Sequence, residues 1–278
     1  MSATVMSFCN QKGGVGKTST TALVSYNLSK LGYKTLVIDF DPQANITQLF
    51  LKTKTRGQSA VATINKSLMT VLQNEEPLTN AILSINENLD LIPTAVDFSL
   101  YGRFLENKES DEKSRVSYFR KLLEDQLIDR YDFIFIDVPP TLGLSNDTAF
   151  YACDQIIIVL QTQERSLVGA EYLIEYLQRV IINSFQSKVD VIGLLPVLSK
   201  RDSSVDAKIL QSASEEFGED NIFNSHITIM ERVKRMDMTG ITDNDKDAWD
   251  RKTQNAYKAV AEEIIERLNK GKQETDNQ

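Results

Sequence analysis

Rare residue types limit what this chain can be. Cysteine occurs only at Cys9 and Cys153 in 278 residues, and this wide separation does not suggest the disulfide framework of a small secreted domain. We expect both thiols to be buried as small apolar side chains. The single histidine, His226, has no cysteine or acidic partners in its strand pattern, so it is not expected to bind a metal. The single tryptophan, Trp249, is expected to anchor the start of the last helix.

Long apolar segments are also missing. No run of 18 or more apolar residues occurs, so no transmembrane helix is expected. The start, MSATVMSFCN, lacks the basic residues and the apolar stretch of a signal peptide. The net charge of −8 argues against a uniformly basic nucleic-acid coat but leaves room for a local basic patch. These features favour a cytoplasmic protein.

The sequence has no linker rich in Pro, Gly or Ser, no internal repeat and no low-complexity tract. With 41% hydrophobic and 25% charged residues, its composition is that of an ordinary globular domain. We therefore predict one domain over residues 1–268 and a disordered polar tail over 269–278.

Apolar runs alternate with helical segments along the chain. The runs are rich in Val, Ile and Leu and nearly continuous, which is the pattern of parallel strands covered on both faces. They read TVMSFC, YKTLVIDFD, NLDLIPT, YDFIFIDVPP, DQIIIVLQT, VDVIGLLPVL and NIFNSHITI. Helices are predicted from Lys17 to Leu31 and over 112–129, 165–184, 203–217 and 250–268. This order predicts a single-domain α/β fold with a mostly parallel, twisted central sheet and helices on both faces.

The stretch CNQKGGVGKTSTT, residues 9–21, predicts a phosphate-binding loop. Its glycines allow backbone N–H groups to turn toward phosphate oxygens, and the helix that follows adds its positive N-terminal end. Lys17 is expected to reach the β- and γ-phosphates, and the Thr18 hydroxyl to hold Mg²⁺. Because the loop follows a strand and opens a helix, it indicates a P-loop NTPase. Lys12 is a further cation that such a loop does not require.

Carboxylates end two of the predicted strands. Asp137 follows the run FIFI, where a carboxylate can hold Mg²⁺ through a water. Asp39 ends a second run and is followed two residues later by Asp41. Residues i and i+2 of a strand face the same side, so both side chains are expected to point into one site. One would orient a metal-bound water and the other the attacking water.

Three segments resemble the ParA family of plasmid and chromosome partition ATPases, which carry a deviant Walker A motif. The segments are QKGGVGKTSTTALVSYNLSKLGYKTLVIDFDPQAN, LDLIPTAVDFSL and YDFIFIDVPPTLGLSNDTAF. The resemblance covers nearly the whole chain and is most specific in its first half. It implies a P-loop ATPase that hydrolyses ATP with Mg²⁺, slowly unless a partner protein and DNA stimulate it.

In that family the early lysine, here Lys12, crosses the interface of a sandwich dimer to the phosphates of the other subunit's ATP. The resemblance therefore implies catalytic roles for Lys12 and Lys17, with Lys12 supplying charge as an arginine finger does. It implies that Asp41 positions the hydrolytic water and that Thr18, Asp39 and Asp137 form the magnesium shell. The implied nucleotide-binding residues are Lys12, Gly13, Gly14, Val15, Gly16, Lys17, Thr18 and Ser19.

The DNA-binding positions of the family match this sequence less closely. Members often carry a Pro-Arg-Asn stretch and then a basic residue, whereas this chain has ITIMERVKRMDMTG, which contains Arg232, Lys234 and Arg235. The stretch LSKRDSS places Lys200 and Arg201 where relatives carry another DNA-contacting arginine. For each basic cluster, DNA contact and a solvated charged face both stay open.

The resemblance also implies partners and a setting. The partners are a second copy of the chain with ATP, non-specific double-stranded DNA and a ParB-like centromere-binding protein, in a nucleoid-associated cytoplasmic setting without membrane. The loop begins within ten residues of Met1, so we expect no N-terminal helix-turn-helix domain.

Other functions remain as alternatives. A MinD-like membrane-associated positioning ATPase needs a basic amphipathic C-terminal helix, whereas residues 262–278 carry five acids and three bases. A reductase of the nitrogenase iron-protein type needs cluster-ligating cysteines, and Cys153 has no companion at a suitable spacing. Metabolic kinases or synthetases with the same loop stay open.

Overall fold

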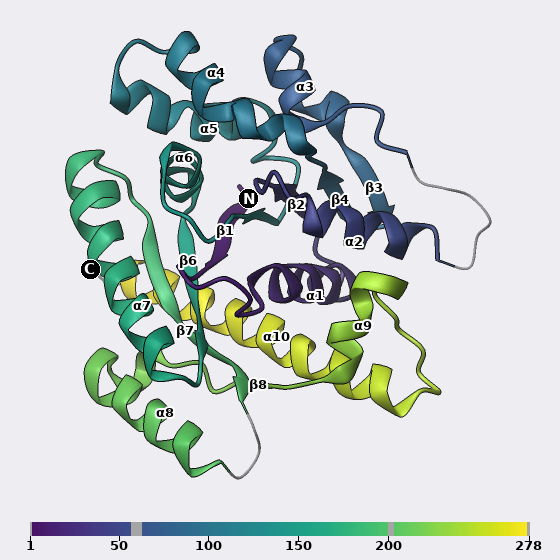
Figure 1. The fold of residues 1–278 in the computed structure, drawn as a ribbon, viewed down its shortest axis with the longest axis vertical. Coiled ribbons are helices and arrows are strands. Elements are labelled where there is room, and N and C mark those ends of the chain that lie inside the picture. The colour runs from purple at the N-terminus through teal and green to yellow at the C-terminus, as the bar shows by residue number, and fades with distance from the viewer. Residues whose placement is uncertain (1, 57–62, 200–202, 277–278) are drawn as a thin grey trace.

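Eight strands form one sheet in the computed structural model, which describes residues 2–56, 63–199 and 203–276. Their order across the sheet is β3-β4-β2-β5-β1-β6-β7-β8 (Figure 1). Neighbouring strands are parallel, except for the antiparallel pair β3–β4 at one edge. The strands are β1 (Thr4–Cys9), β2 (Thr35–Asp39), β3 (Leu83–Asn86), β4 (Leu89–Ile92), β5 (Phe133–Asp137), β6 (Gln155–Gln161), β7 (Asp190–Ser199) and β8 (Ile227–Thr228).

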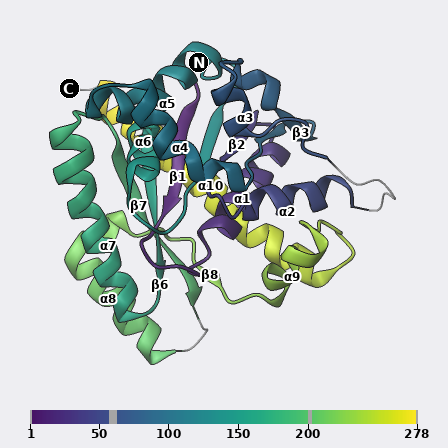
Figure 2. The ribbon, with the colours of Figure 1, turned by 45° about the horizontal axis from the view of Figure 1, so that its top comes forward.

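Helices cover both faces of the sheet (Figures 1 and 2). One layer consists of α1 (Lys17–Lys30), α2 (Asn45–Lys54), α9 (Glu231–Thr239) and α10 (Ala248–Asp276). The other consists of α3 (Leu68–Gln73), α4 (Tyr101–Lys108), α5 (Glu112–Gln126), α6 (Leu144–Ala152), α7 (Glu164–Tyr176), η3 (Leu177–Ser184) and α8 (Ser204–Phe217). The 3-10 turns η1 (Leu78–Ala81), η2 (Val96–Leu100) and η4 (Glu219–Asn221) complete the connections. Both faces of the central strands are buried, as the continuous apolar runs indicate, so the predicted fold class is confirmed.

Several elements differ from their predicted form. The sequence does not predict β3, since this edge strand is only partly buried and has no continuous apolar run. The predicted strand over 221–229 is reduced to β8 and one bridge between Leu194 and Ile222. The helix predicted over 165–184 is α-helical to Tyr176 and then π-helical to Ser184.

Helix α10 continues past residue 268, where the sequence predicts the domain to end. It extends to Asp276, so the described part of the predicted tail is helical. An ion pair one helical turn apart spans the start of this extension, since Glu266 contacts Lys270 at 2.6 Å. Such pairs stabilise a helix, which apolar periodicity alone does not reveal.

Of the predictions made for the rare residue types, the one for Trp249 is wrong. Cys9 and Cys153 are buried, as predicted, and burial raises the pKa of the Cys9 thiol to about 12. Trp249 does not anchor α10 by packing, since its side chain lies on the surface at 64% exposure. The start of α10 is held instead by the Asp247 carboxylate, which accepts the N–H of Trp249 at 2.8 Å and that of Asp250 at 3.1 Å.

Helix α1 lies between the sheet and α10 and carries the predicted loop at its N-terminus (Figure 1). Because it is covered on both sides, several of its polar residues are buried, among them Ser25 and Asn27. The Asn27 side chain donates to the Leu23 carbonyl at 2.8 Å and to Gln254 Oε1 on α10 at 2.9 Å. These bonds satisfy buried polar groups and fix the helix that positions the loop.

At Gly240, which follows α9, the chain packs very closely against the backbone of α2. The φ of Gly240 is 70°, and a Cβ at this position would lie 2.6 Å from the backbone nitrogen of Thr53. Both the left-handed conformation and the space therefore require glycine. The N–H of Ile241 donates to Thr53 Oγ1 at 2.9 Å, so this contact fixes α9 against α2.

Replacing Gly240 by alanine should lower the free energy of unfolding by about 2 kcal/mol or more, since backbone strain and overpacking add together. Urea denaturation followed by circular dichroism measures this change. The control is Gly102→Ala in α4, where a Cβ meets no described atom within 4 Å and alanine should stabilise the helix by up to about 1 kcal/mol. Equal stability of the two variants would contradict the close approach of α9 to α2.

Candidate nucleotide site

The predicted phosphate loop connects β1 to α1 at the carboxyl edge of the sheet. Gly14 and Gly16 have φ of 72° and 92°, values that favour glycine. Gly16 precedes the first turn of α1, and no described side chain caps that turn. Added Cβ atoms at Gly13, Gly14 and Gly16 would meet no described atom within 4 Å. The loop therefore presents the free N–H groups of a helix N-terminus to open space, which is the arrangement that binds phosphate.

Lys17 is buried inside this loop, with 6% of its surface exposed. Its ammonium donates to the Lys12 carbonyl at 3.2 Å. Burial lowers the pKa of Lys17, while electrostatic interaction with the ionisable groups of Cys9 and Asp137 opposes this shift. A buried ammonium that is hydrogen-bonded to a backbone carbonyl is stabilised by an anionic ligand, as the predicted phosphate contact requires.

The Lys12 side chain extends from the loop toward the end of β6. Its ammonium donates to Gln161 Oε1 at 3.0 Å and to Gln163 Oε1 at 2.6 Å. Its backbone N–H donates to Asn10 Oδ1 at 2.8 Å, and the Asn10 amide donates to the Val159 carbonyl of β6 at 2.7 Å. The two lysines of the motif thus occupy different places: one lies in the loop and the other at the neighbouring strand end.

Asp39 and Asp137 lie side by side because β2 and β5 pair in register at these two residues. Both carboxylates are buried. Burial raises the pKa of Asp137 to about 8, and the nearby charge of Asp39 adds to the rise, whereas a hydrogen bond from Thr18 opposes it. Burial raises the pKa of Asp39 to about 7, against hydrogen bonds from Thr47 and from the Asp41 backbone. A bound cation would relieve this accumulation of negative charge.

Asp41 takes its direction from a turn and not from strand alternation, since β2 ends at Asp39. The Asp41 N–H donates to Asp39 Oδ1 at 3.0 Å, and its own carboxylate accepts the N–H of Gln43 at 2.9 Å. Asp41 lines a cavity of about 520 Å³ between the β2–α2 turn, η2 and the β5–α6 loop. The three carboxylates lie at one edge of the sheet, as expected. Asp41, however, is placed there by a turn and not by the alternation of side chains along a strand.

Sequence reasoning missed three polar residues that support the site. Asn10 braces the loop against β6, Thr21 donates to Asp137 Oδ1 at 3.3 Å, and Thr47 donates to Asp39 Oδ2 at 2.6 Å. Each is a buried polar residue close in sequence to a motif residue. The sequence carries no signal that separates such positions from ordinary buried polar residues.

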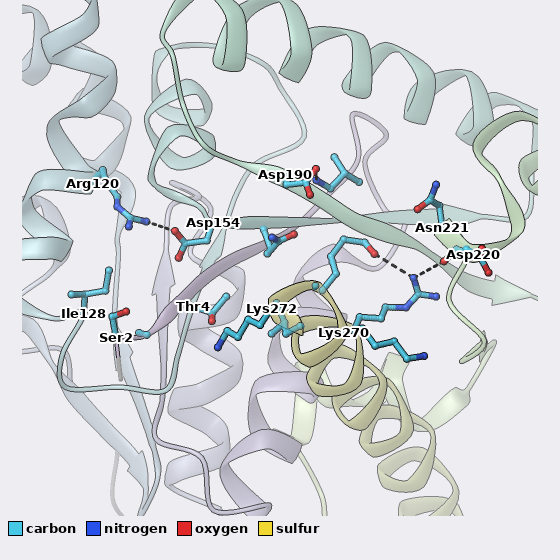
Figure 3. Close-up of a pocket in the computed structure, with 17 residues that line it drawn as sticks. Ser2, Thr4, Arg120, Ile128, Asp154, Asp190, Asp220, Asn221, Lys270 and Lys272 are labelled. Carbon is cyan, nitrogen blue, oxygen red and sulfur yellow. Dashed lines mark hydrogen bonds and ion pairs between the residues drawn. The ribbon is translucent and has the colours of Figure 1, made fainter. Parts of the chain in front are cut away.

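A larger cavity, about 820 Å³ in volume, lies at the opposite, amino-terminal edge of the sheet (Figure 3). Both of its arginines already have partners: Arg120 contacts Asp154 at 2.8 Å, and Arg267 donates to the Asp220 carbonyl at 2.8 Å. Ligands of open α/β sheets bind at the carboxyl ends of the strands. The loop edge is therefore the better candidate site, although it is the smaller hollow.

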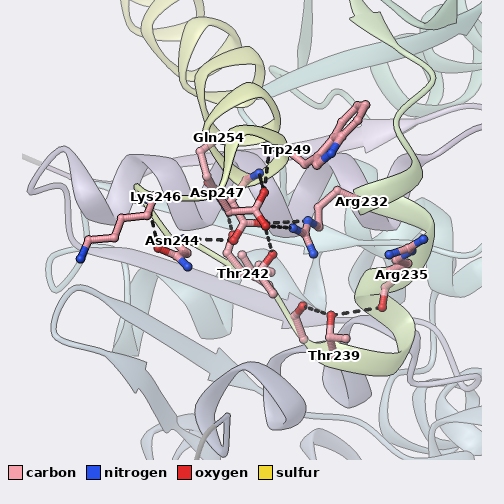
Figure 4. A network of polar contacts seen from close by, with 12 residues as sticks. Arg232, Arg235, Thr239, Thr242, Asn244, Lys246, Asp247, Trp249 and Gln254 are labelled. Atoms are coloured by element: carbon pink, nitrogen blue, oxygen red, sulfur yellow. Dashed lines mark hydrogen bonds and ion pairs between the residues drawn. The ribbon is translucent and has the colours of Figure 1, made fainter.

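The basic residues of α9 differ in what they contact. Arg232 pairs with Asp247 at 2.6 Å and with Asp250 at 2.7 Å and is only 20% exposed (Figure 4). Lys234 is exposed and pairs with Glu231 at 2.8 Å, and Arg235 is exposed. The predicted cluster of three cations therefore has one member that joins α9 to α10. Lys200 and Arg201 lie outside the described residues.

Known proteins resemble this chain in sequence and in fold. A family model described as an AAA domain matches residues 3–191. The chromosome-partitioning ATPase Soj of Treponema pallidum is 28% identical over 262 residues, which cover 94% of this chain and 96% of that protein.

Two solved structures share the fold at 21% identity, a level that speaks for the fold alone. A variant of McdA of Cyanothece in complex with ATP superposes with a TM-score of 0.79 and covers 94% of this chain and 96% of that one. Cobyrinic acid a,c-diamide synthase of Mycobacterium smegmatis, with an ATP analogue and magnesium, superposes with a TM-score of 0.77 and covers 97% and 96%. The AAA-domain model covers more than half of the chain, and together with the similarity to Soj it shows that the chain belongs to the ParA family of partition ATPases.

Proposed function

We propose that this protein is a Mg²⁺-dependent ATPase that partitions DNA as an ATP-bound sandwich dimer. The observation that carries the proposal is the separation of the two lysines around one glycine loop. Lys17 lies inside the loop, whereas Lys12 reaches Gln161 and Gln163 outside it. A cation outside the cradle of its own subunit is suited to a phosphate held by a second subunit.

The residues of the loop edge fit Mg-ATP. The N–H groups of the loop from Gly13 to Ser19, together with the Lys17 ammonium, would hold the phosphates. The Thr18 hydroxyl and the buried pair Asp39 and Asp137 are hard oxygen donors, the kind that Mg²⁺ prefers. Bound Mg²⁺ supplies positive charge that neutralises the phosphates. Burial raises the pKa of Asp39 to about 7 and that of Asp137 to about 8, and a bound cation would favour the charged form of both carboxylates.

Within this site, the residues of the chain divide the work of hydrolysis. Asp41, on a turn fixed by Asp39, would orient the attacking water. Lys12 from the other subunit would stabilise the negative charge that develops on the transferred phosphoryl group. A single subunit has no such second cation, so turnover is slow until the dimer forms.

DNA binding would follow from the same dimer. Each subunit exposes Lys234 and Arg235 on α9, and a dimer would present two copies together, so that weak contacts gain through effective concentration. Phosphate contacts of this kind do not read sequence. A ParB-like centromere-binding protein that triggers hydrolysis would then release the dimer from nucleoid DNA. Family membership and the name of the Treponema pallidum relative support this part of the proposal.

The MinD-like alternative finds less support. No described helix combines the length and the apolar character needed to cross a bilayer. An amphipathic anchor would need a free apolar face on α10, yet Val260, Ala261 and Ile264 of that helix are buried against the sheet layer. We therefore propose that the dimer binds DNA and not a membrane.

Replacing Lys12 by alanine should leave ATP affinity within about threefold of wild type but abolish the ATP-dependent dimer and lower turnover by about 10²-fold, as loss of a charge-stabilising donor does. Light scattering and phosphate release measure these effects. Lys17→Ala is the contrasting variant, because it should lose ATP affinity itself in titration calorimetry. A Lys12→Ala protein that dimerises and hydrolyses like wild type would refute the trans role.

The double variant Lys234→Ala, Arg235→Ala should bind double-stranded DNA more weakly with ATP, and the log–log salt slope should shrink by about 0.9 per lost phosphate contact. Fluorescence anisotropy with ATP and with ADP measures both. Lys113→Ala, Lys121→Ala on α5 removes the same charge from the opposite helical layer and should bind as wild type does. Equal binding with ATP and ADP would refute the nucleotide switch, and an unaffected α9 variant would move the DNA surface elsewhere.

Asp137→Asn should change how the stability of the nucleotide-free protein depends on pH. The folded wild type holds a proton on Asp137 up to a pKa of about 8, whereas the unfolded chain releases it at about pH 4, so its free energy of unfolding falls as pH rises between these values. Asparagine does not titrate, so this fall is absent in the variant. Relative to wild type, the free energy of unfolding of the variant should therefore rise by at least about 1 kcal/mol between about pH 5 and 8.5. Urea denaturation in EDTA tests this; parallel pH curves would contradict it.

A further inference from the structure

Thr47 lies at the centre of a buried hydrogen-bond chain below the turn that carries Asp41. It is in the first turn of α2 and is fully buried. Its hydroxyl donates to Asp39 Oδ2 at 2.6 Å, and its backbone N–H donates to the same oxygen at 3.2 Å. The other oxygen, Oδ1, accepts the N–H of Asp41 at 3.0 Å. One carboxylate therefore joins α2 to the Asp41 turn.

The direction of the Thr47 hydroxyl is fixed from both sides. While its hydrogen points to Asp39, its oxygen accepts the N–H of Thr94 at 3.1 Å. Thr94 follows β4 and is itself fully buried. A hydroxyl that donates to one fixed group and accepts from another cannot rotate without breaking a buried bond. The chain Thr94–Thr47–Asp39–Asp41 thus runs without a gap from β4 to the turn.

The same carboxylate compensates for an uncapped helix. The residue before α2 is Ala44, whose side chain offers no cap and whose φ is 55°. Asp39 accepts the N–H of Thr47 in the first turn, so a strand-end carboxylate performs the work of a capping side chain. Three donors therefore meet the two oxygens of Asp39, which holds the side chain in one orientation.

We propose that Thr47 is a positioning residue for ATP hydrolysis: by clamping Asp39 it fixes the backbone of Asp41 and hence the carboxylate that orients the attacking water. This inference rests on the proposed function, because it assigns Asp41 the water. Thr47 touches neither the nucleotide loop nor the paired Asp137 in the contacts described. Its loss should therefore separate turnover from nucleotide binding.

Thr47→Val keeps the branched shape but removes the hydroxyl, so Asp39 loses its shortest bond and the Thr94 N–H loses its acceptor. Turnover should fall about tenfold to a hundredfold, the range for a lost orienting partner. ATP affinity by calorimetry and the ATP dimer by light scattering should stay within about threefold of wild type. Thr47→Ser keeps the hydroxyl and should restore most of the turnover.

A second measurement does not depend on activity. Hydrogen–deuterium exchange of the nucleotide-free protein should show faster exchange at the Asp41 amide in Thr47→Val and in Thr47→Ala, which retains high helix propensity if valine impairs folding. The control is Thr55→Val at the other end of α2, where the hydroxyl donates to the Leu51 carbonyl at 3.0 Å. That variant should exchange and turn over as wild type does.

Asp41→Ala, measured in parallel, distinguishes a failure of the role assigned to Thr47 from a failure of the proposed function. If Asp41→Ala stalls hydrolysis while Thr47→Val turns over at the wild-type rate, the role of Thr47 is overturned and the proposed function stands. Wild-type turnover in Asp41→Ala would remove the basis of both. A Thr47→Val protein that loses ATP affinity and dimer as much as turnover, or whose Asp41 amide exchanges like wild type, would reduce Thr47 to a packing residue.

Discussion

The parallel register of β2 with β5 is the constraint on which the site depends. It places Asp39 directly beside Asp137 in a region closed to water. Because β1 pairs with β5 on one side and β6 on the other, the same register brings the glycine loop to this edge, with Gln161 beyond it. Two neighbouring carboxylates in a low dielectric favour protonation or a cation. The pairing of the two strands therefore places two carboxylates where a proton or a cation is needed to balance their charge.

Buried hydrogen bonds make this crowding of acids tolerable. Asp39 receives donors from α2 and from its own turn, and Asp137 receives one from Thr21 of α1. The donors from α1 and α2 belong to helices that also pack in the core, so the site and the fold stabilise one another. The amide of Asn10 has the same function for the loop, because it binds the loop to β6. A change in the packing of α1 or α2 is consequently a change in the site.

Local patterns account for the parts of the site that lie on one continuous segment. Glycine spacing, an apolar run before it and a helix after it suffice to locate Lys17, and a run that ends in aspartate locates Asp137. What the sequence could not reveal depends on contacts between distant segments. Arg232 looks like one cation of a surface cluster, but Asp247 and Asp250 bind it across a loop. Trp249 is apolar and large, yet tertiary packing leaves it on the surface.

The partners of Lys12 have a consequence for how fast the proposed dimer could form. Gln161 and Gln163 are neutral amides, and a neutral acceptor holds an ammonium less tightly than a carboxylate does. In the proposed dimer, Lys12 would exchange these two contacts for a phosphate of the other subunit, and weak neutral acceptors favour that exchange. A glutamate at either position would retain the cation longer. The amides thus hold Lys12 in place, while the rate at which the proposed dimer forms is left to diffusion and orientation.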